Sequence, residues 1–491
     1  MGSMSTSGPR SPDVLSTLEG IATPSPTTRA FSPQPLTSLP EWIGRAVGGM
    51  GVLLCTALLL ISGTSQAQPQ RGPGEPVDAA ARAKMVERVS AVLNETYVFP
   101  EVAKKMEAAL RQKLKAGAYE KLAHSAELAD ALTRDLQEVS KDKHLSILYA
   151  PTAPPGLDPK APRDAAADER QRRELASINF GFEKVERLTG NVGYLELRGF
   201  IGAELAGETA IAAMNFLSHS DAVIIDLRKN GGGDPSMIQL ITSYFFAEPT
   251  HLNSFYIRKG NTTHQFWTSA HVSGKRMTDV PVYVLTSSRT FSAAEEFSYN
   301  LKNLKRATLV GETTGGGAHP VEPHFLADVR LMAIVPFGRA VNPITGTNWE
   351  GTGVAPDLQV PADKALEAAH LDALKKLQAR ATDDRRKQEL AWALQRVEAL
   401  ARPVTLSAEV LKSFAGRYGR STLVYENSSL WFQWRQDGPK LRVVPMSADT
   451  LMLDDVDHLR FRIEKDASGK VTGLTELSAD GRTVKSPRGA N

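Results

Sequence analysis

The sequence predicts an α/β core with a mainly parallel sheet, an N-terminal helical bundle and a C-terminal all-β domain. Between residues 192 and 311, short apolar runs such as AVIID alternate with amphipathic runs such as SAAEEFSYNLKNL. Continuous apolar strands separated by helices are typical of parallel sheets that are covered on both faces. Residues 79–140 space their apolar side chains at helical intervals, and from about 407 onward short alternating runs are divided by turn signals.

The length and charge of the chain limit its organisation and its partners. A chain of 491 residues is too long for one ordinary core and predicts two to four domains. Lysine and arginine number 58 against 55 aspartate and glutamate, a net charge of +3 without any basic block. We therefore expect neither a nucleic-acid partner nor binding to an anionic membrane surface.

The first part of the chain has the pattern of an exported protein. Residues 1–40 are rich in Ser, Pro and Thr and predict a disordered leader. Residues 41–67 run from an arginine through an apolar stretch to small residues, as a secretory signal peptide does, with cleavage expected after Ala67. The apolar stretch is short for a permanent anchor, which needs about 20 residues. The only cysteine, Cys55, lies inside it, so the predicted mature protein, secreted or periplasmic, has no disulfide.

The remaining segments predict six further parts. The Pro/Gly-rich residues 68–78 read as a linker. A helical domain (79–150), a polar linker (151–177), the α/β domain (178–365), a helical connector (366–402) and a small β-rich barrel or sandwich (403–491) then follow in order.

Ser292 stands where a strand meets a helix, after VYVLTSSRTF and before AAEEFSYNLKNL. Amide groups in the first turn of a helix lack intrahelical partners, so an anion beside this serine would find hydrogen-bond donors there. The glycine run NGGG (230–233) follows another apolar strand. Because parallel strands end at one edge of a sheet, we expect both loops to meet there. The alternative is that Ser292 only caps its helix.

Four ordered motifs, DAVIIDLRKNGGG, VYVLTSSRTFSAAEEF, ATLVGETTGGG and NWEGTGVAPDLQVP, resemble the superfamily of tail-specific (C-terminal processing) peptidases. That superfamily includes the tricorn core protease and the interphotoreceptor retinoid-binding protein. The resemblance covers about residues 80–365 and is similar to the branch without a PDZ domain. It implies a crotonase-like ββα core.

The resemblance implies a nucleophile and an oxyanion hole. The serine of the TFSAAE motif is the family's nucleophile and corresponds to Ser292. The oxyanion hole corresponds to the backbone amides of Gly231 or Gly232 and of Ala293. Glycines suit this role because they allow the backbone to approach closely.

The base differs between branches of the family. Processing peptidases use a lysine about 25 residues beyond the serine, and Gly317 stands at that position here. The tricorn-like branch uses a histidine from a segment before the sheet and a glutamate from a late loop. These correspond to His144 in DKHLSI and Glu350 in NWEGTG. An imidazole can accept the serine proton and return it to the leaving amine. Taken singly, His144 could equally be a helix-end histidine bonded to carbonyls, and Glu350 a surface charge.

Other polar clusters have structural explanations. Glu295 and Glu296 lie in the first turn of the Ser292 helix, where the helix dipole stabilises acidic side chains, so capping is the expected role. His319 and His324 flank Glu322 in AHPVEPH, but this spacing fits no standard zinc motif. We expect no metal and no cofactor.

The sequence thus predicts an exported serine-type peptidase that hydrolyses peptide or protein substrates through an acyl-enzyme on Ser292. Two alternatives stay open. One is a non-catalytic binder of small apolar ligands, which the missing lysine favours. The other is an esterase, because the same oxyanion chemistry serves any acyl transfer. No membrane domain is expected beyond an N-terminal anchor, and the sequence does not predict an oligomeric state.

Overall fold

The computed structural model describes residues 73–154, 157, 165–435 and 437–489. These residues all fall within one compact unit, Ala46–Asn491. The predicted leader (1–40) and signal peptide (41–67) lie outside the described residues. Among the helices that are described, none combines the length and the apolar character needed to cross a membrane.

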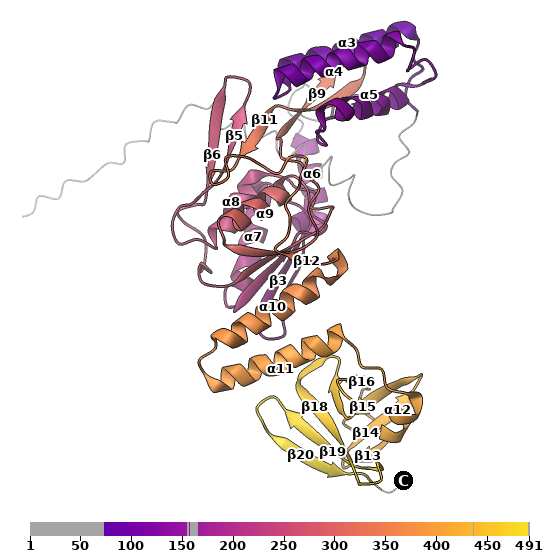
Figure 1. Cartoon of the computed structure of the whole chain (residues 1–491), viewed down its shortest axis with the longest axis vertical. Coiled ribbons are helices and arrows are strands. Elements are labelled where there is room, and N and C mark those ends of the chain that lie inside the picture. The colour runs from indigo at the N-terminus through magenta and orange to yellow at the C-terminus, as the bar shows by residue number, and fades with distance from the viewer. Residues whose placement is uncertain (1–72, 155–156, 158–164, 436, 490–491) are drawn as a thin grey trace, which may run out of the picture. The chain divides into compact units, whose positions relative to one another are not determined.

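A six-stranded sheet, of which β3 and β12 are labelled in Figure 1, forms the centre of the α/β core. Its strand order is β12-β8-β7-β4-β3-β2. All neighbouring pairs are parallel except β2 with β3. The predicted mainly parallel sheet is therefore confirmed. Its strands are β2 (Phe182–Leu188), β3 (Val192–Leu197), β4 (Ala222–Asp226), β7 (Val282–Thr286), β8 (Ala307–Gly311) and β12 (Leu358–Gln359).

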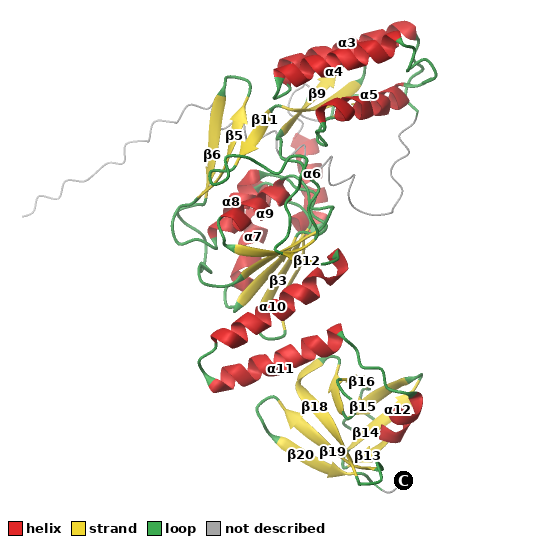
Figure 2. Cartoon of the chain, viewed as in Figure 1, coloured by secondary structure: helices red, strands yellow, loops and turns green. Residues whose placement is uncertain are grey.

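Helices cover both faces of this sheet (Figure 2). Side chains alternate along each strand, so Val223 and Ile225 of β4 pack on one face, and Ala222 and Ile224 on the other. One face carries α7 (Ala203–Leu217), α8 (Pro235–Ser243) and α9 (Ala293–Asn303); the opposite face carries α10 (Ala365–Arg380) and α11 (Asp384–Ala401). This double cover explains why the central strands read as continuous apolar runs.

Two small antiparallel sheets were not predicted. One orders β11 (Gly338–Val341), β5 (His251–Ile257) and β6 (Thr262–Trp267); the other orders β1 (Ser146–Tyr149), β10 (Leu331–Pro336) and β9 (Val321–Leu326). Most side chains of β6 are exposed, so this strand lacks the apolar alternation that marks a half-buried strand. The partner strands β11 and β10 also lie far away in the sequence, where local patterns give no signal.

The N-terminal bundle is confirmed, with α3 (Ala79–Thr96), α4 (Pro100–Lys115) and α5 (Ser125–Ser140). Its core continues into that of the β1-β10-β9 sheet, because Leu145, Ile147 and Leu331 share one buried cluster with the helices. Strand β1 follows α5 directly and pairs with β10, with Ser146 opposite Ile334. The bundle is therefore attached to the β1-β10-β9 sheet by this strand pairing and by the shared core.

Residues 151–177 were predicted to be a polar linker, and the structure has a helix in their last part. Residues Ala165–Ser177 form the helix α6. Leu175 is its one buried hydrophobic residue, so the helix has no apolar face for a pattern search to detect.

The C-terminal part begins with α12 (Ala408–Phe414) and continues as an eight-stranded antiparallel sheet in chain order. The first and last strands meet through a bridge between Tyr418 and Arg488, and Gly489 N–H donates to Arg417 O at 2.8 Å. This closure corresponds to the predicted barrel rather than to a sandwich. The strands are β13 (Gly416–Tyr418), β14 (Ser421–Glu426), β15 (Ser429–Gln433), β16 (Leu441–Pro445), β17 (Thr450–Leu453), β18 (Val456–Lys465), β19 (Val471–Ser478) and β20 (Thr483–Pro487).

The packing of α9 gives a test of this fold. Phe297 on α9 is fully buried, and its ring centroid lies 5.5 Å from that of Phe200. Phe297→Ala should lower the free energy of unfolding by about 3–5 kcal/mol because it leaves a cavity. Phe216→Ala is the matched control, since Phe216 is 60% exposed; its effect should stay within about 0.5 kcal/mol. Chemical denaturation of both variants measures the difference, and equal losses would contradict the packing described.

Candidate active site

Ser292 occupies the N-cap position of α9 with an unusual backbone conformation. Its φ of 54° and ψ of −123° lie outside the extended region that an N-cap residue normally adopts. A non-glycine residue held there costs roughly 1–3 kcal/mol, and such residues gather at functional sites. This strained conformation is more than helix capping requires, although Ser292 and Glu295 also form a capping box.

Glu295 fixes the turn that carries Ser292. Its carboxylate, which is fully buried, accepts the N–H of Ser292 at 2.9 Å. It also accepts the Thr314 hydroxyl at 2.5 Å and the N–H groups of Gly316 and Gly317 at 2.6 and 2.8 Å. The sequence predicted only that Glu295 lies in the first turn of this helix, where the dipole stabilises a carboxylate. The bonds from Thr314, Gly316 and Gly317 join the serine turn to the loop that starts at Thr314.

The glycine run and the serine turn meet at the sheet edge, as predicted. Phe291 N–H donates to Asn230 O at 3.1 Å, and a Cβ on Gly232 would lie 2.7 Å from that of Ser292. Gly232 also has a φ of +112°, which favours glycine. Its N–H is already donated to Asn230 Oδ1 at 2.9 Å. Of the predicted oxyanion amides, those of Gly231 and Ala293 keep no bonded partner within the described part of the chain.

His144 lies between α5 and β1 and is only 7% exposed. Neither of its ring nitrogens has a hydrogen-bond partner among the described residues, so it is not a helix-end histidine bonded to carbonyls. Its ring packs on Phe291, the neighbour of Ser292, with centroids 4.6 Å apart. Burial lowers the pKa of His144 to about 4, mainly because the charged ring would lose its water. His144 is therefore a neutral imidazole beside the serine turn.

Gly317 leaves the space that this ring occupies. A Cβ on Gly317 would lie 2.6 Å from His144 Cε1 and 2.3 Å from Phe291 Cζ. Any side chain at this position would collide with the ring. A lysine at 317 and a histidine at 144 are consequently alternatives that cannot both fit in the observed arrangement.

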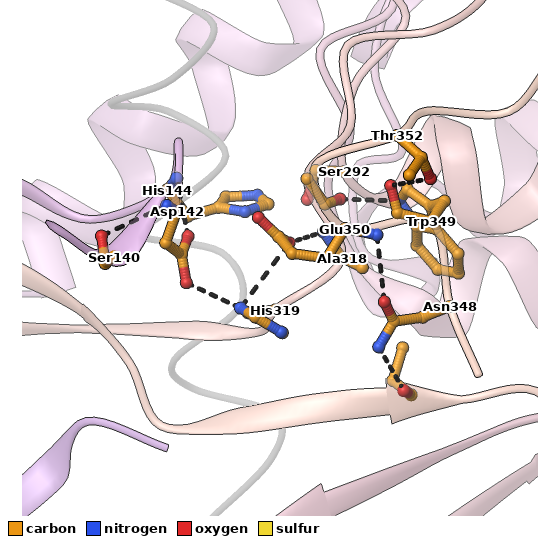
Figure 3. Close-up of polar contacts among 12 residues, drawn as sticks. Ser140, Asp142, His144, Ser292, Ala318, His319, Asn348, Trp349, Glu350 and Thr352 are labelled. Atoms are coloured by element: carbon orange, nitrogen blue, oxygen red, sulfur yellow. Dashed lines mark hydrogen bonds and ion pairs between the residues drawn. The ribbon is translucent and has the colours of Figure 1, made fainter. Parts of the chain in front are cut away.

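Glu350 faces the same place from the loop after β11 (Figure 3). Its side chain is 16% exposed, so it is not a surface charge. Oε2 accepts the N–H of Ala318 at 2.5 Å, whereas Oε1 is buried and has no hydrogen-bond partner among the residues that the structure describes. One carboxylate oxygen of Asp142, one of Glu350 and one ring nitrogen of His144 all lie within 4.8 Å of one another. Burial raises the pKa of Glu350 to about 7, and the charge of Asp142 adds to this effect.

Asp142 and His319 belong to the same cluster, and the sequence analysis did not identify them. Asp142 Oδ1 accepts the N–H of His144 at 3.1 Å, and its Oδ2 contacts His319 Nδ1 at 2.6 Å. The D-x-H spacing was an available signal, because an aspartate often bonds the amide two residues later. His319 had been considered only as a metal ligand.

Within the described ranges, Asp142, His144 and Glu350 are the one group spaced as metal ligands could be. However, Asp142 is already paired with His319. His324, whose ring is 3.0 Å from Glu322, is not among the three, so the AHPVEPH segment forms no metal centre of its own.

Comparisons with known proteins show which family the chain is similar to. Residues 191–360 match peptidase family S41. Residues 79–182 match the N-terminal domain of Peptidase_S41 in eukaryotic IRBP. Together the two matches span more than half of the 491 residues.

Two curated relatives are similar to part of the chain. A carboxyl-terminal-processing protease of Picosynechococcus sp. is 29% identical over 164 residues, which are 33% of this chain and 38% of the relative. The chloroplastic carboxyl-terminal-processing peptidase 1 of Arabidopsis thaliana is 27% identical over 195 residues, 39% of this chain and 38% of the relative. The chain thus matches less than two fifths of the length of either. The solved photosystem II D1 C-terminal processing protease gives a TM-score of 0.39 at 16% identity, over 57% of this chain and 94% of that one.

The fit between Gly317 and His144 is testable without any activity assay. Gly317→Ala should push the His144 ring out of its site and return water to it, so the pKa of His144 should rise from about 4 toward its ordinary value. NMR titration of the ring measures this change. Gly207→Ala is the control, because the nearest atom to a Cβ there is at 3.8 Å. A His144 titration that is the same in both variants would show that Gly317 does not hold the ring in place.

Proposed function

Because the chain belongs to peptidase family S41, we propose that it is an exported serine-type peptidase that cleaves peptide bonds through an acyl-enzyme on Ser292. One observation carries this proposal. A neutral His144, whose ring nitrogens have no partner in the described part of the chain, packs beside the serine turn in the space that Gly317 leaves open. A neutral imidazole can act as the base for a serine. Without such a role, nothing would offset the cost of burying its ring nitrogens without hydrogen bonds.

The first half-reaction makes the acyl-enzyme. His144 accepts the proton of Ser292 Oγ as this oxygen attacks the substrate carbonyl carbon. The negative charge then develops on the carbonyl oxygen, where the N–H groups of Gly231 and Ala293 would donate hydrogen bonds. When the peptide C–N bond breaks, His144 returns its proton to the leaving amine. Water later hydrolyses the ester by the same steps.

Glu350 is assigned the role of orienting His144. Its Oε1, which is buried and bonds to none of the described residues, can accept a hydrogen bond from the ring. When it is ionised, the Glu350 carboxylate, within 4.8 Å of the ring, stabilises the imidazolium that forms during attack. It thereby offsets the effect of burial, which lowers the pKa of His144.

The proposed substrate is a peptide or protein, since both curated relatives are named for processing carboxyl termini. Export is proposed from residues 41–67, and would place the protein in a secreted or periplasmic location.

The assignment of the nucleophile is tested by replacing it. Ser292→Ala should abolish hydrolysis of casein or peptide substrates, because no other group would form the acyl-enzyme. Ser288→Ala is the matched control, since Ser288 is an exposed serine of the same turn, and it should keep the wild-type rate. Equal rates for wild type and Ser292→Ala would exclude Ser292 as nucleophile. Hydrolysis of esters but not of peptides by the wild type would favour the esterase alternative.

The role of Glu350 predicts a pH dependence. Glu350 is protonated below its pKa of about 7 and then cannot stabilise the imidazolium. Thus kcat/KM should fall as the pH drops through about 7. Glu350→Gln should lower the rate and remove this limb of the profile. Glu322→Gln, a change of a carboxylate that pairs with His324 instead, should leave the profile unchanged. If the limb persists in Glu350→Gln, another group causes it.

A further inference from the structure

His319 lies between two carboxylates that come from distant segments of the chain. Its Nδ1 is 2.6 Å from Asp142 Oδ2 and 3.6 Å from Glu350 Oε2. The His319 side chain is 6% exposed and that of Asp142 is 1% exposed. Figure 3 shows the ion-pair contacts that connect the three side chains. His319 therefore bridges the segment that carries His144 and the loop that carries Glu350.

The charges around this ring favour a cation. Burial by itself lowers the pKa of His319, but the hydrogen bond and charge of Asp142 outweigh it, so that the pKa is raised. Conversely, burial by itself raises the pKa of Asp142, but the contact with His319 lowers it below its ordinary value. Asp142 and Glu350 both lie close to His319. Without a cation between them, these two carboxylates would share a proton.

We propose that His319 is a positioning residue: as an imidazolium held by Asp142, it keeps Glu350 ionised and turned toward His144. The consequence for catalysis depends on the proposed function, whereas the effect of His319 on the charge of Glu350 does not. His319 does not touch Ser292 or the reacting atoms in this scheme. It acts through Glu350, which in turn acts on His144.

The other charged and titratable groups near the pair are few. Arg339 of β11 opposes the charge of His319, and Glu295 of α9 adds to the rise in the pKa of Glu350. Tyr97, at the end of α3, donates its hydroxyl to Asp142 Oδ2 at 3.3 Å. His144 faces Asp142 from the neighbouring position. The charge of His319 lowers the pKa of Glu350, and the N–H of Ala318 acts in the same direction.

The substitution that tests this removes the charge and keeps the hydrogen bond. The side-chain amide of asparagine places its nitrogen near the position of Nδ1 of histidine, so His319→Asn can still donate to Asp142. His324→Asn is the matched control, because His324 also pairs with a carboxylate, Glu322 at 3.0 Å, but lies outside the cluster. The readout is NMR titration of the Glu350 carboxyl carbon in protein labelled with ¹³C-glutamate, assigned with Glu350→Gln.

The proposal predicts that the midpoint of the Glu350 titration rises by roughly one pH unit or more in His319→Asn and stays unchanged in His324→Asn. The acid limb of kcat/KM should move in the same direction, while the rate at high pH returns to near the wild-type value. An unchanged midpoint would overturn the proposal. A rate lowered equally at every pH, together with an unchanged midpoint, is what a purely structural role of His319 predicts.

The two proposals can fail separately. If the midpoint rises but the acid limb of kcat/KM does not move, the charge relation between His319 and Glu350 stands and the catalytic role of Glu350 is wrong. If near-UV circular dichroism shows that His319→Asn is not folded, His319→Gln removes the same charge with a longer side chain, and the same two outcomes decide.

Discussion

The geometry of the site depends on one buried carboxylate, that of Glu295. Taking a carboxylate out of water is costly, and burial raises the pKa of Glu295. Four donors, from the serine turn and from the Thr314–Gly317 loop, compensate for that cost. Because one side chain accepts hydrogen bonds from both segments, neither segment can move away without removing some of the bonds that compensate for its burial. The nucleophile turn and the loop beside it are therefore fixed as one unit.

The position of that loop determines where a base can come from. Glu295 accepts the N–H of Gly317, and the Gly317 carbonyl accepts the indole N–H of Trp349 at 2.7 Å. These two bonds hold the loop so that a space stays open beside Phe291. His144 fills this space from the N-terminal helical region, which is fastened by the pairing of β1 with β10. The docking of that region is thus part of the proposed active site. A chain with the core alone would have Ser292 without the base proposed for it.

Much of the fold and part of the site could be predicted from the sequence, because they follow from local patterns. Buried parallel strands read as apolar runs, and the loops after them meet at one edge, which brings NGGG to Ser292. The resemblance to a known family pointed to His144 and Glu350. The contacts of Glu295 beyond its own helix and the pair of Asp142 with His319, 177 positions apart in the chain, could not be predicted, because neither has a local pattern. Exposed or polar elements such as β6 and α6 were missed for the same reason.

The central claim is that Ser292 is activated by His144 rather than by a lysine. The rate at which a fluorophosphonate labels Ser292, followed by mass spectrometry of the intact protein, measures this activation directly. The account predicts rapid labelling of the wild type and a rate lower by about 10²–10⁴ in His144→Gln. Lys302→Gln, which changes a lysine on the Ser292 helix paired with Asp357, should label as the wild type does. Equal labelling of wild type and His144→Gln would contradict the account.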